Sequence, residues 1–226
     1  MALAPLHELP ALRDRAPVFR DRAAAGAVLA QMLETYRGSG ALVAGIPAGG
    51  VPVAAEIALR LELELEAMPV SKILFPWDTE SGFGAVAFDG GVWVNWSQAR
   101  LAGLSEKEVA RCTAQARAKV ERRIEELRGG RPFPQLAERA VIAVDDGIAA
   151  GSTLRVAIAA LRRQQAREIV VAVPTGSART VERIAEQVNA LWCANVRSAA
   201  RFAVADAYEN WHDVQEDEVA AILARF

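Results

Sequence analysis

Short apolar segments alternate with segments of helical periodicity along most of the chain, and this alternation restricts its fold more than any other feature. Short apolar runs bounded by glycine, proline or acidic residues are typical of buried strands. We expect strands at 41–46, 63–68, 70–75, 140–144, 168–174 and 190–195. We expect helices at 20–37, 51–61, 105–128, 152–163, 177–188 and 215–225. This order predicts an α/β, Rossmann-like fold, in which a mainly parallel sheet carries helices on both faces.

The region at about 69–110 departs from this alternation. It mixes glycines, aromatic residues and two short strand-like pieces, and it contains Trp77, Trp93 and Trp96. We interpret it as a flap or hood inserted into one domain that spans residues 1–226. Because so apolar an insertion is poorly suited to water on every side, we expect the protein to form a homodimer.

The composition excludes several functional classes. With 52% hydrophobic and 24% charged residues and a formal net charge of −2, the chain offers no electrostatic attraction for nucleic acid. The cysteines Cys112 and Cys193 and the histidines His7 and His212 have no metal-ligand spacing. We see no signal peptide and no membrane-spanning apolar run, so we expect a reduced, cytoplasmic protein.

The stretch "RAVIAVDDGIAAGSTLRVAI", at 139–158, carries the most specific chemistry. An apolar run ends in two neighbouring acids, Asp145 and Asp146, and small residues lead from there into a helix. Uncovered main-chain amides at a helix start form a cradle for a phosphate monoester. The cradle residues are Gly147, Ile148, Ala149, Ala150, Gly151, Ser152 and Thr153. Because acids repel phosphate but accept hydrogen bonds from hydroxyls, the stretch predicts binding of a sugar 5-phosphate with a vicinal diol.

The same stretch resembles a known family motif. Four apolar residues, two acids, a small-residue loop, glycine and a hydroxyl residue form the phosphoribosyl pyrophosphate (PRPP) motif of type I phosphoribosyltransferases. The motif sequence here is similar to that of a group of predicted bacterial and archaeal phosphoribosyltransferases, which have a DDGIATG-like motif. The segments "PAGGVPVAAE" at 47–56, "SKI" at 71–73 and "GAV" at 84–86 extend the likeness, which covers about 18–223.

The resemblance implies a fold and a reaction. The family transfers the 5-phosphoribosyl group of PRPP to a nitrogenous acceptor, a base or an amine, and releases pyrophosphate with Mg2+. Carried over, the catalytic residues are Asp145, Asp146 and Lys72, and residues 147–153 hold the 5-phosphate. Ala48, Gly49 and Gly50 correspond to the pyrophosphate loop, and Pro174, Phe202 and Tyr208 to an acceptor pocket. The resemblance implies that Mg2+ is held through PRPP and water near the two aspartates, and that the flap closes to exclude water.

Three residues depart from the family pattern. The relatives carry Arg or Lys at the position of Ala48, and Ser71 replaces another arginine. Ala149 stands where hypoxanthine-type enzymes have an aspartate, which argues against ordinary hypoxanthine and guanine salvage. Ala48, in the pyrophosphate loop, cannot offset the negative charge that develops on the leaving pyrophosphate. The cations that could compensate are Lys72, Arg100 and Arg111.

Alternatives therefore stay open at this point. The protein could be a catalytically weak or inactive regulator that binds PRPP or another ribose phosphate, or a hydrolase that uses water as acceptor. The loop at 141–153 could bind another phosphate, and 47–50 could be a plain strand-to-helix turn. We expect replacement of either aspartate by asparagine to weaken PRPP binding with little loss of fold.

Overall fold

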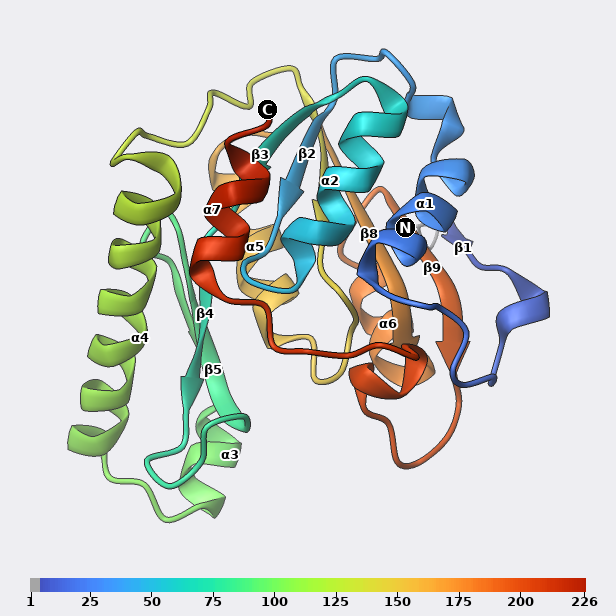
Figure 1. Ribbon diagram of the computed structural model, residues 1–226. Helices are drawn as coiled ribbons and strands as arrows, with labels where there is room; N and C mark the ends of the chain where they lie inside the picture. Colours follow the sequence, from blue (N-terminus) through green and yellow to red (C-terminus); the bar gives the residue numbers. More distant parts are fainter. Residues whose placement is uncertain (1–4) are drawn as a thin grey trace.

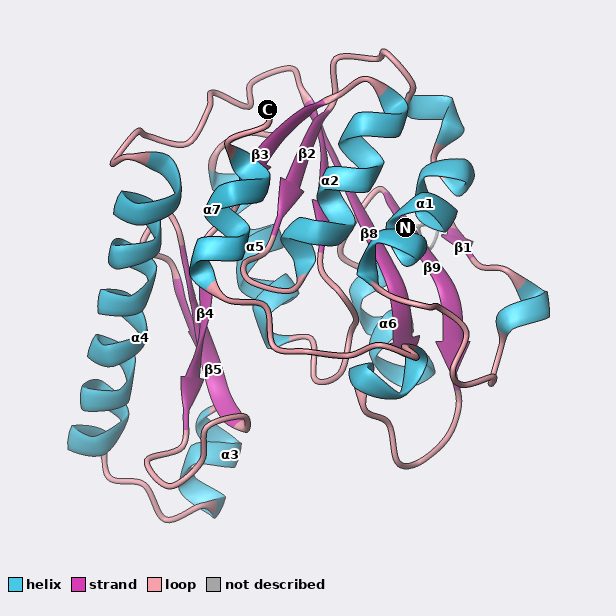
Figure 2. Cartoon of the chain, in the orientation of Figure 1, coloured by secondary structure: helices cyan, strands magenta, loops and turns pink. Residues whose placement is uncertain are grey.

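The computed structural model describes residues 5–226, and its centre is a six-stranded sheet in which every pairing is parallel (Figures 1 and 2). The strand order is β1-β9-β8-β7-β2-β3. The strands are β1 (Leu6–His7), β2 (Leu42–Gly45), β3 (Glu64–Ala67), β7 (Ala140–Val144), β8 (Glu168–Ser177) and β9 (Ala190–Arg197). This arrangement confirms the predicted α/β fold with a parallel sheet.

Helices cover both faces of this sheet, as the alternation predicted. On β7, Ile142 and Val144 belong to the core under α1 (Arg22–Met32) and α2 (Gly50–Leu61). Val141 and Ala143 belong to the core under α5 (Ser152–Arg163) and α6 (Ala178–Ala185). The strand is apolar at every position because both of its faces are buried. No helix among residues 5–226 is both long and apolar enough to cross a lipid bilayer.

A second, antiparallel sheet forms the body of the insertion. It consists of β4 (Val70–Leu74), β5 (Gly82–Ala87) and β6 (Val92–Val94), in the order β4-β5-β6. Its outer face packs on α3 (Trp96–Leu101) and α4 (Glu106–Arg128), and its other face contributes to the core around α5. In Figure 1, α4 runs alongside this sheet at the outer edge of the molecule. The helix that covers the second sheet continues through Arg128, in agreement with the helix expected at 105–128.

The strand and helix boundaries differ from the sequence-based expectation at a few places. The predicted helix 20–37 ends at Met32 and continues as a 3-10 turn at Glu34–Tyr36. Strand β8 extends to Ser177 rather than 174, because Thr175, Gly176 and Ser177 still pair with β9. The remaining short elements are α7 (Glu216–Leu223) and 3-10 turns at Pro10–Leu12 and Val204–Ala207. Neither α3 nor the short edge strand β1 was expected.

Helices α1 and α2 approach each other closely at Gly26. A Cβ atom on Gly26 would lie 2.6 Å from the Val53 carbonyl oxygen and 2.7 Å from Glu56 Cβ. This contact sets the position of the first turn of α1, where Arg22 reaches over the loop that precedes α2. The Nε of Arg22 lies 3.3 Å from the point where a Cβ on Gly49 would stand.

We predict that Gly26→Ala destabilises the protein by about 1 kcal/mol. On an open helix face the same change stabilises by about 1 kcal/mol, but overpacking a close helix contact costs about 1–3 kcal/mol. Urea unfolding of the wild type and the variant measures the difference. A more stable variant would contradict the close helix contact.

Candidate functional site

A cleft of about 800 Å³ opens at the carboxyl ends of β2 and β7, between the main sheet and the second sheet. Parallel sheets bind ligands at such edges. The main sheet contributes residues 46–49 and 145–154, and the C-terminal region contributes 203–205, Trp211, Asp213 and Val214. The insertion contributes residues of β4, the turn 79–82, and Lys119 and Arg123 of α4. The cleft therefore joins both parts of the molecule.

The two acids follow β7 directly and both line the cleft. One Asp145 carboxylate oxygen accepts a hydrogen bond from the Asp146 amide (2.9 Å), and the other accepts from Thr153 Oγ1 (3.4 Å). Burial, and then the neighbouring Asp146 charge, raise the pKa of Asp145 to about 8. The ionised Asp145 carboxylate would therefore be stabilised by a partner that donates hydrogen bonds or brings positive charge.

Asp146 has a counter-ion that the sequence analysis missed. Arg22, which is 5% exposed, donates from Nε (3.0 Å) and Nη2 (2.9 Å) to Asp146 Oδ2. Its Nη1 donates to the His212 carbonyl at 2.9 Å, and its guanidinium lies 3.9 Å from the centre of the Trp211 ring. The Tyr208 hydroxyl donates to the Asp146 carbonyl at 2.6 Å. Asp146 is thus held on two sides, whereas Asp145 has no cationic partner within hydrogen-bond reach among residues 5–226.

The small-residue loop leaves most of its amides unused. Among residues 5–226, no hydrogen bond is formed by the amides of Ala149, Ala150, Gly151, Ser152 or Thr153. Ile148 differs, because its amide donates to the Thr175 carbonyl at 2.9 Å and its side chain is buried in the core. Helix α5 begins at Ser152, so its positive end faces the loop. Free amides at the start of a helix are suited to binding an anion.

The glycine loop at 47–50 lies directly against the acids. A Cβ on Gly49 would overlap Asp146 Oδ2, and one on Gly50 would lie 2.6 Å from the Val144 carbonyl oxygen. The peptide between Pro47 and Ala48 is cis. Both glycines are therefore required by the close approach of two loops, and the role of 47–50 as a pyrophosphate loop stays a prediction.

The cations of the cleft differ from those expected. Lys72 lines the cleft, and its Nζ donates to the Glu80 carbonyl at 3.3 Å. Arg100 on α3 and Arg111 on α4 are exposed and are not among the lining residues. Arg22, Lys119 and Arg123 line it instead. The sequence periodicity of α4 did not indicate that Lys119 and Arg123 line a cleft, because a charged helix face is typical of a solvent-exposed surface.

The residues expected to form an acceptor pocket do not line the cleft. Pro174 is buried within β8, and Tyr208 packs on Phe19 and Trp211 in the core. Phe202 is half-buried, and its neighbours Ala203, Val204 and Ala205 take the lining position. Ser71 lines the cleft and is 6% exposed. An acceptor role for Pro174, Phe202 and Tyr208 stays a prediction.

Comparison with known proteins gives relatives that cover most of the chain. No family model matches. Two curated proteins of Mycobacterium tuberculosis, from strains H37Rv and CDC 1551, each carry the name "Putative phosphoribosyl transferase". Both are 36% identical over 208 residues, which are 92% of this chain and 47% of theirs. This chain thus spans about half the length of these curated relatives.

A solved structure is similar over nearly its whole length. The protein TT1426 from Thermus thermophilus has 33% sequence identity and a TM-score of 0.74. The match covers 92% of this chain and 98% of that one. The likeness therefore includes the main sheet and the insertion together.

We predict opposite effects of Asp145→Asn and Asp146→Asn on stability. The raised pKa of Asp145 means that the folded state binds more protons than the unfolded state between pH 4 and pH 8, so ionisation destabilises the fold as pH rises through this window. Asp145→Asn removes that cost and should exceed wild-type stability by about 1 kcal/mol at pH 8, with a smaller gain at pH 5. Asp146→Asn weakens the contact of buried Arg22 and should cost about 1–3 kcal/mol.

Denaturant unfolding of the three proteins at pH 5 and pH 8 checks both statements. A gain for Asp145→Asn that does not grow with pH would contradict the burial of its charge.

Proposed function

We propose, since the chain belongs to the type I phosphoribosyltransferase family, that it transfers the 5-phosphoribosyl group of PRPP to a nitrogenous acceptor and releases pyrophosphate. The observation that carries this proposal is the pairing of Asp145 and Asp146 with the unused amides of 149–153 in one cleft. Acids suit a vicinal diol, and bare amides suit a phosphate monoester. This pairing in one cleft supports PRPP binding independently of the similarity to the family.

The cleft suggests how PRPP would lie. Its 5-phosphate would accept hydrogen bonds from the amides at 149–153, and its ribose hydroxyls would donate to Asp145 and Asp146. The pyrophosphate would then reach the loop at Ala48, Gly49 and Gly50, on the other side of the acids. This arrangement leaves the ribose C1 between the two loops, where the acceptor nitrogen attacks as pyrophosphate leaves.

The role of the surrounding residues follows from the charge that develops at the ribose. The transition state carries positive charge on the sugar, and a carboxylate beside the hydroxyls stabilises it. Water would compete with the acceptor, so the residues of β4 and the turn 79–82 that line the cleft serve to cover it. Lys72, from β4, would act on the charge of the substrate phosphates.

We propose that Mg2+ enters with PRPP rather than in a protein cage. Among the described residues, no group of three or more His, Cys, Asp or Glu side chains could hold a metal ion. Mg2+ keeps several waters and is commonly bound by one or two carboxylates together with substrate phosphates. Asp145 and Asp146 fit that role through water, and the ion would neutralise charge on the leaving pyrophosphate.

The wider proposal concerns the partners of this protein. We propose a small-molecule acceptor, no nucleic-acid partner and a cytoplasmic location. The net charge of −2 supports the second statement, and the two buried, unpaired thiols of Cys112 and Cys193 support the third, since reducing compartments keep such thiols free. The acceptor itself would be selected by the lining residues at 203–205 and by Trp211 and Asp213.

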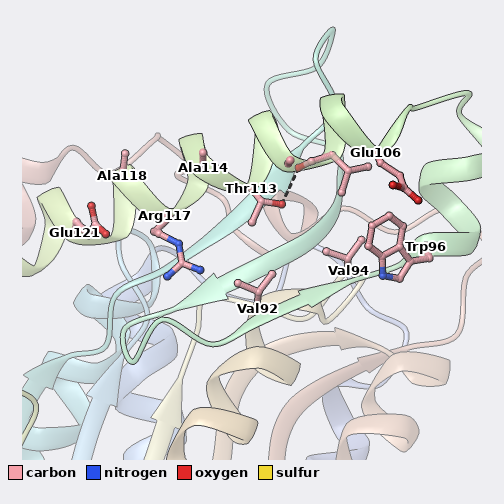
Figure 3. A pocket seen from close by; sticks show the side chains of 11 residues that line it. Val92, Val94, Trp96, Glu106, Thr113, Ala114, Arg117, Ala118 and Glu121 are labelled. Carbon is pink, nitrogen blue, oxygen red and sulfur yellow. Dashed lines mark hydrogen bonds between the residues drawn. The ribbon is translucent and has the colours of Figure 1, made fainter.

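We also propose a homodimer, formed through the groove between β6 and α4 (Figure 3). Within residues 5–226, β6 pairs only with β5, so its other edge is open. The groove of about 480 Å³ beside it exposes Val92 and Trp96, opposite the small side chains of Ala114 and Ala118. Arg117, Glu106 and Glu121 flank the groove, so a second copy related by a twofold axis offers complementary charge and a matching strand edge.

The first prediction of this function concerns PRPP binding. We expect the wild type to bind PRPP with Mg2+ in isothermal titration. Asp145→Asn should bind about tenfold more weakly, because it loses a charged acceptor for the ribose hydroxyls. Asp217→Asn, a matched change on the exposed surface of α7, should bind like the wild type. Absence of wild-type binding at millimolar PRPP would overturn the proposal.

Turnover separates the enzyme from a regulator that only binds. PRPP consumption is measured with a panel of bases and amines, in the wild type and in Ala48→Arg. Turnover by the wild type supports the enzyme. Turnover by Ala48→Arg alone would identify a binding protein that lost its loop cation.

The second prediction concerns the dimer. Light scattering should give the wild type twice the chain mass of 24.3 kDa. Val92→Glu should shift it to the monomer, because a charge at the strand edge opposes pairing. Leu59→Glu, at an apolar position on α2 that is still more exposed (57% against 40% for Val92), should leave the dimer intact. A wild-type mass of one chain would contradict the proposal.

A further inference from the structure

The glycine loop of the cleft lacks a positive charge of its own. The loop consists of Pro47, Ala48 and two glycines. Ala48 lines the cleft, but its side chain carries no charge. A leaving pyrophosphate gains negative charge, and its departure is favoured by a fixed cation nearby. If the proposed reaction takes place here, another part of the chain has to supply that cation.

Helix α4 places a cationic face against this loop. Arg123 Nη1 donates to the Pro47 carbonyl and to the Val70 carbonyl, each at 3.0 Å. Lys119 precedes Arg123 by four residues, which puts the two side chains on the same face, one helical turn apart. Lys119 also lines the cleft, together with Ala48 and Lys72.

Lys119 differs from the other cations of the cleft in having no partner. Arg22 is bound to Asp146, and Arg123 pairs with Glu216 Oε1 at 2.7 Å. The ammonium of Lys72 donates to the Glu80 carbonyl. Among residues 5–226, the Lys119 ammonium forms neither a hydrogen bond nor an ion pair. All three of its N–H donors are therefore free for a ligand, whereas Lys72 already uses one of its own.

The surroundings of Lys119 favour a negatively charged ligand. Burial and the neighbouring Arg123 and Arg122 lower its pKa, while Glu216 and Glu80 partly oppose them. The Lys119 side chain is nevertheless exposed at the mouth of the cleft, so a ligand can reach it. A polyphosphate at the loop would offset the repulsion between these positive charges.

We infer that Lys119 binds the pyrophosphate group of PRPP and takes the place of the cation that the loop lacks at Ala48. This inference rests on the proposed function, and it adds α4 to the site. The pyrophosphate would then bridge the main sheet, through Gly49 and Gly50, and the insertion, through Lys119. The leaving group would be held by both parts of the molecule.

The test compares three ligands, PRPP with Mg2+, pyrophosphate with Mg2+ and ribose 5-phosphate, by isothermal titration. Lys119→Met keeps the length of the side chain and removes its charge. We expect it to weaken PRPP and pyrophosphate binding about tenfold and to leave ribose 5-phosphate binding unchanged. Lys119→Arg should retain PRPP binding within about threefold, since it keeps the charge.

Lys107→Met is the matched control, a charge removal on the same helix outside the cleft, and it should bind all three ligands like the wild type. Equal PRPP binding by the wild type and Lys119→Met would overturn the inference while leaving the proposed function intact. So would a uniform loss for all three ligands, or a Lys119→Arg variant as weak as Lys119→Met. A wild type that binds no PRPP would instead reject the proposed function.

Discussion

The parallel pairing of β2 with β7 determines the geometry of the whole cleft. In this pairing Gly45 lies opposite Val144, so the chain leaves both strands at one edge of the sheet. The loop at 47–50 and the acids at 145–146 are therefore neighbours, and they meet so closely that Gly49 and Gly50 leave no room for a Cβ. A register shift of one residue would turn the alternating side chains of the strand to the wrong faces, so the two apolar cores also hold the site in place.

The segments near this pairing were the ones that the sequence predicted best. The bounds of β7 and α5 agree with 140–144 and 152–163, because a strand buried on both faces and a strongly amphipathic helix leave clear patterns. The loop between β7 and α5, with its free main-chain amides, could also be predicted, because its residues are small. What the sequence could not provide is the pairing of residues far apart in the chain: Arg22 and Asp146 are separated by 124 positions, and nothing near either residue indicates the other.

The insertion shows the same limit on a larger scale. Its glycines and tryptophans marked it as different, but the helix that completes it, α4, read as an ordinary helix with a solvated charged face. In the fold, part of this charged face lies against the cleft and not against solvent alone. Arg123 is 7% exposed and donates to the Pro47 carbonyl, and Lys119 lines the cleft. A charged residue on a helix therefore gains a role from what the helix packs against, and this information is absent from the periodicity of the helix itself.

The distribution of charge in the cleft explains why the two aspartates are unequal. Burial raises the pKa of Asp146 as well, but Arg22 offsets part of this effect and fixes the carboxylate, so this residue can serve as a rigid acceptor. Asp145 has only neutral donors, and burial together with the neighbouring Asp146 charge raises its pKa. A ligand that brings hydroxyl donors and a divalent cation favours the ionised form of Asp145 and so opposes this rise in pKa. On the proposed function, the acid that costs the fold stability is the one left free to respond to PRPP and Mg2+.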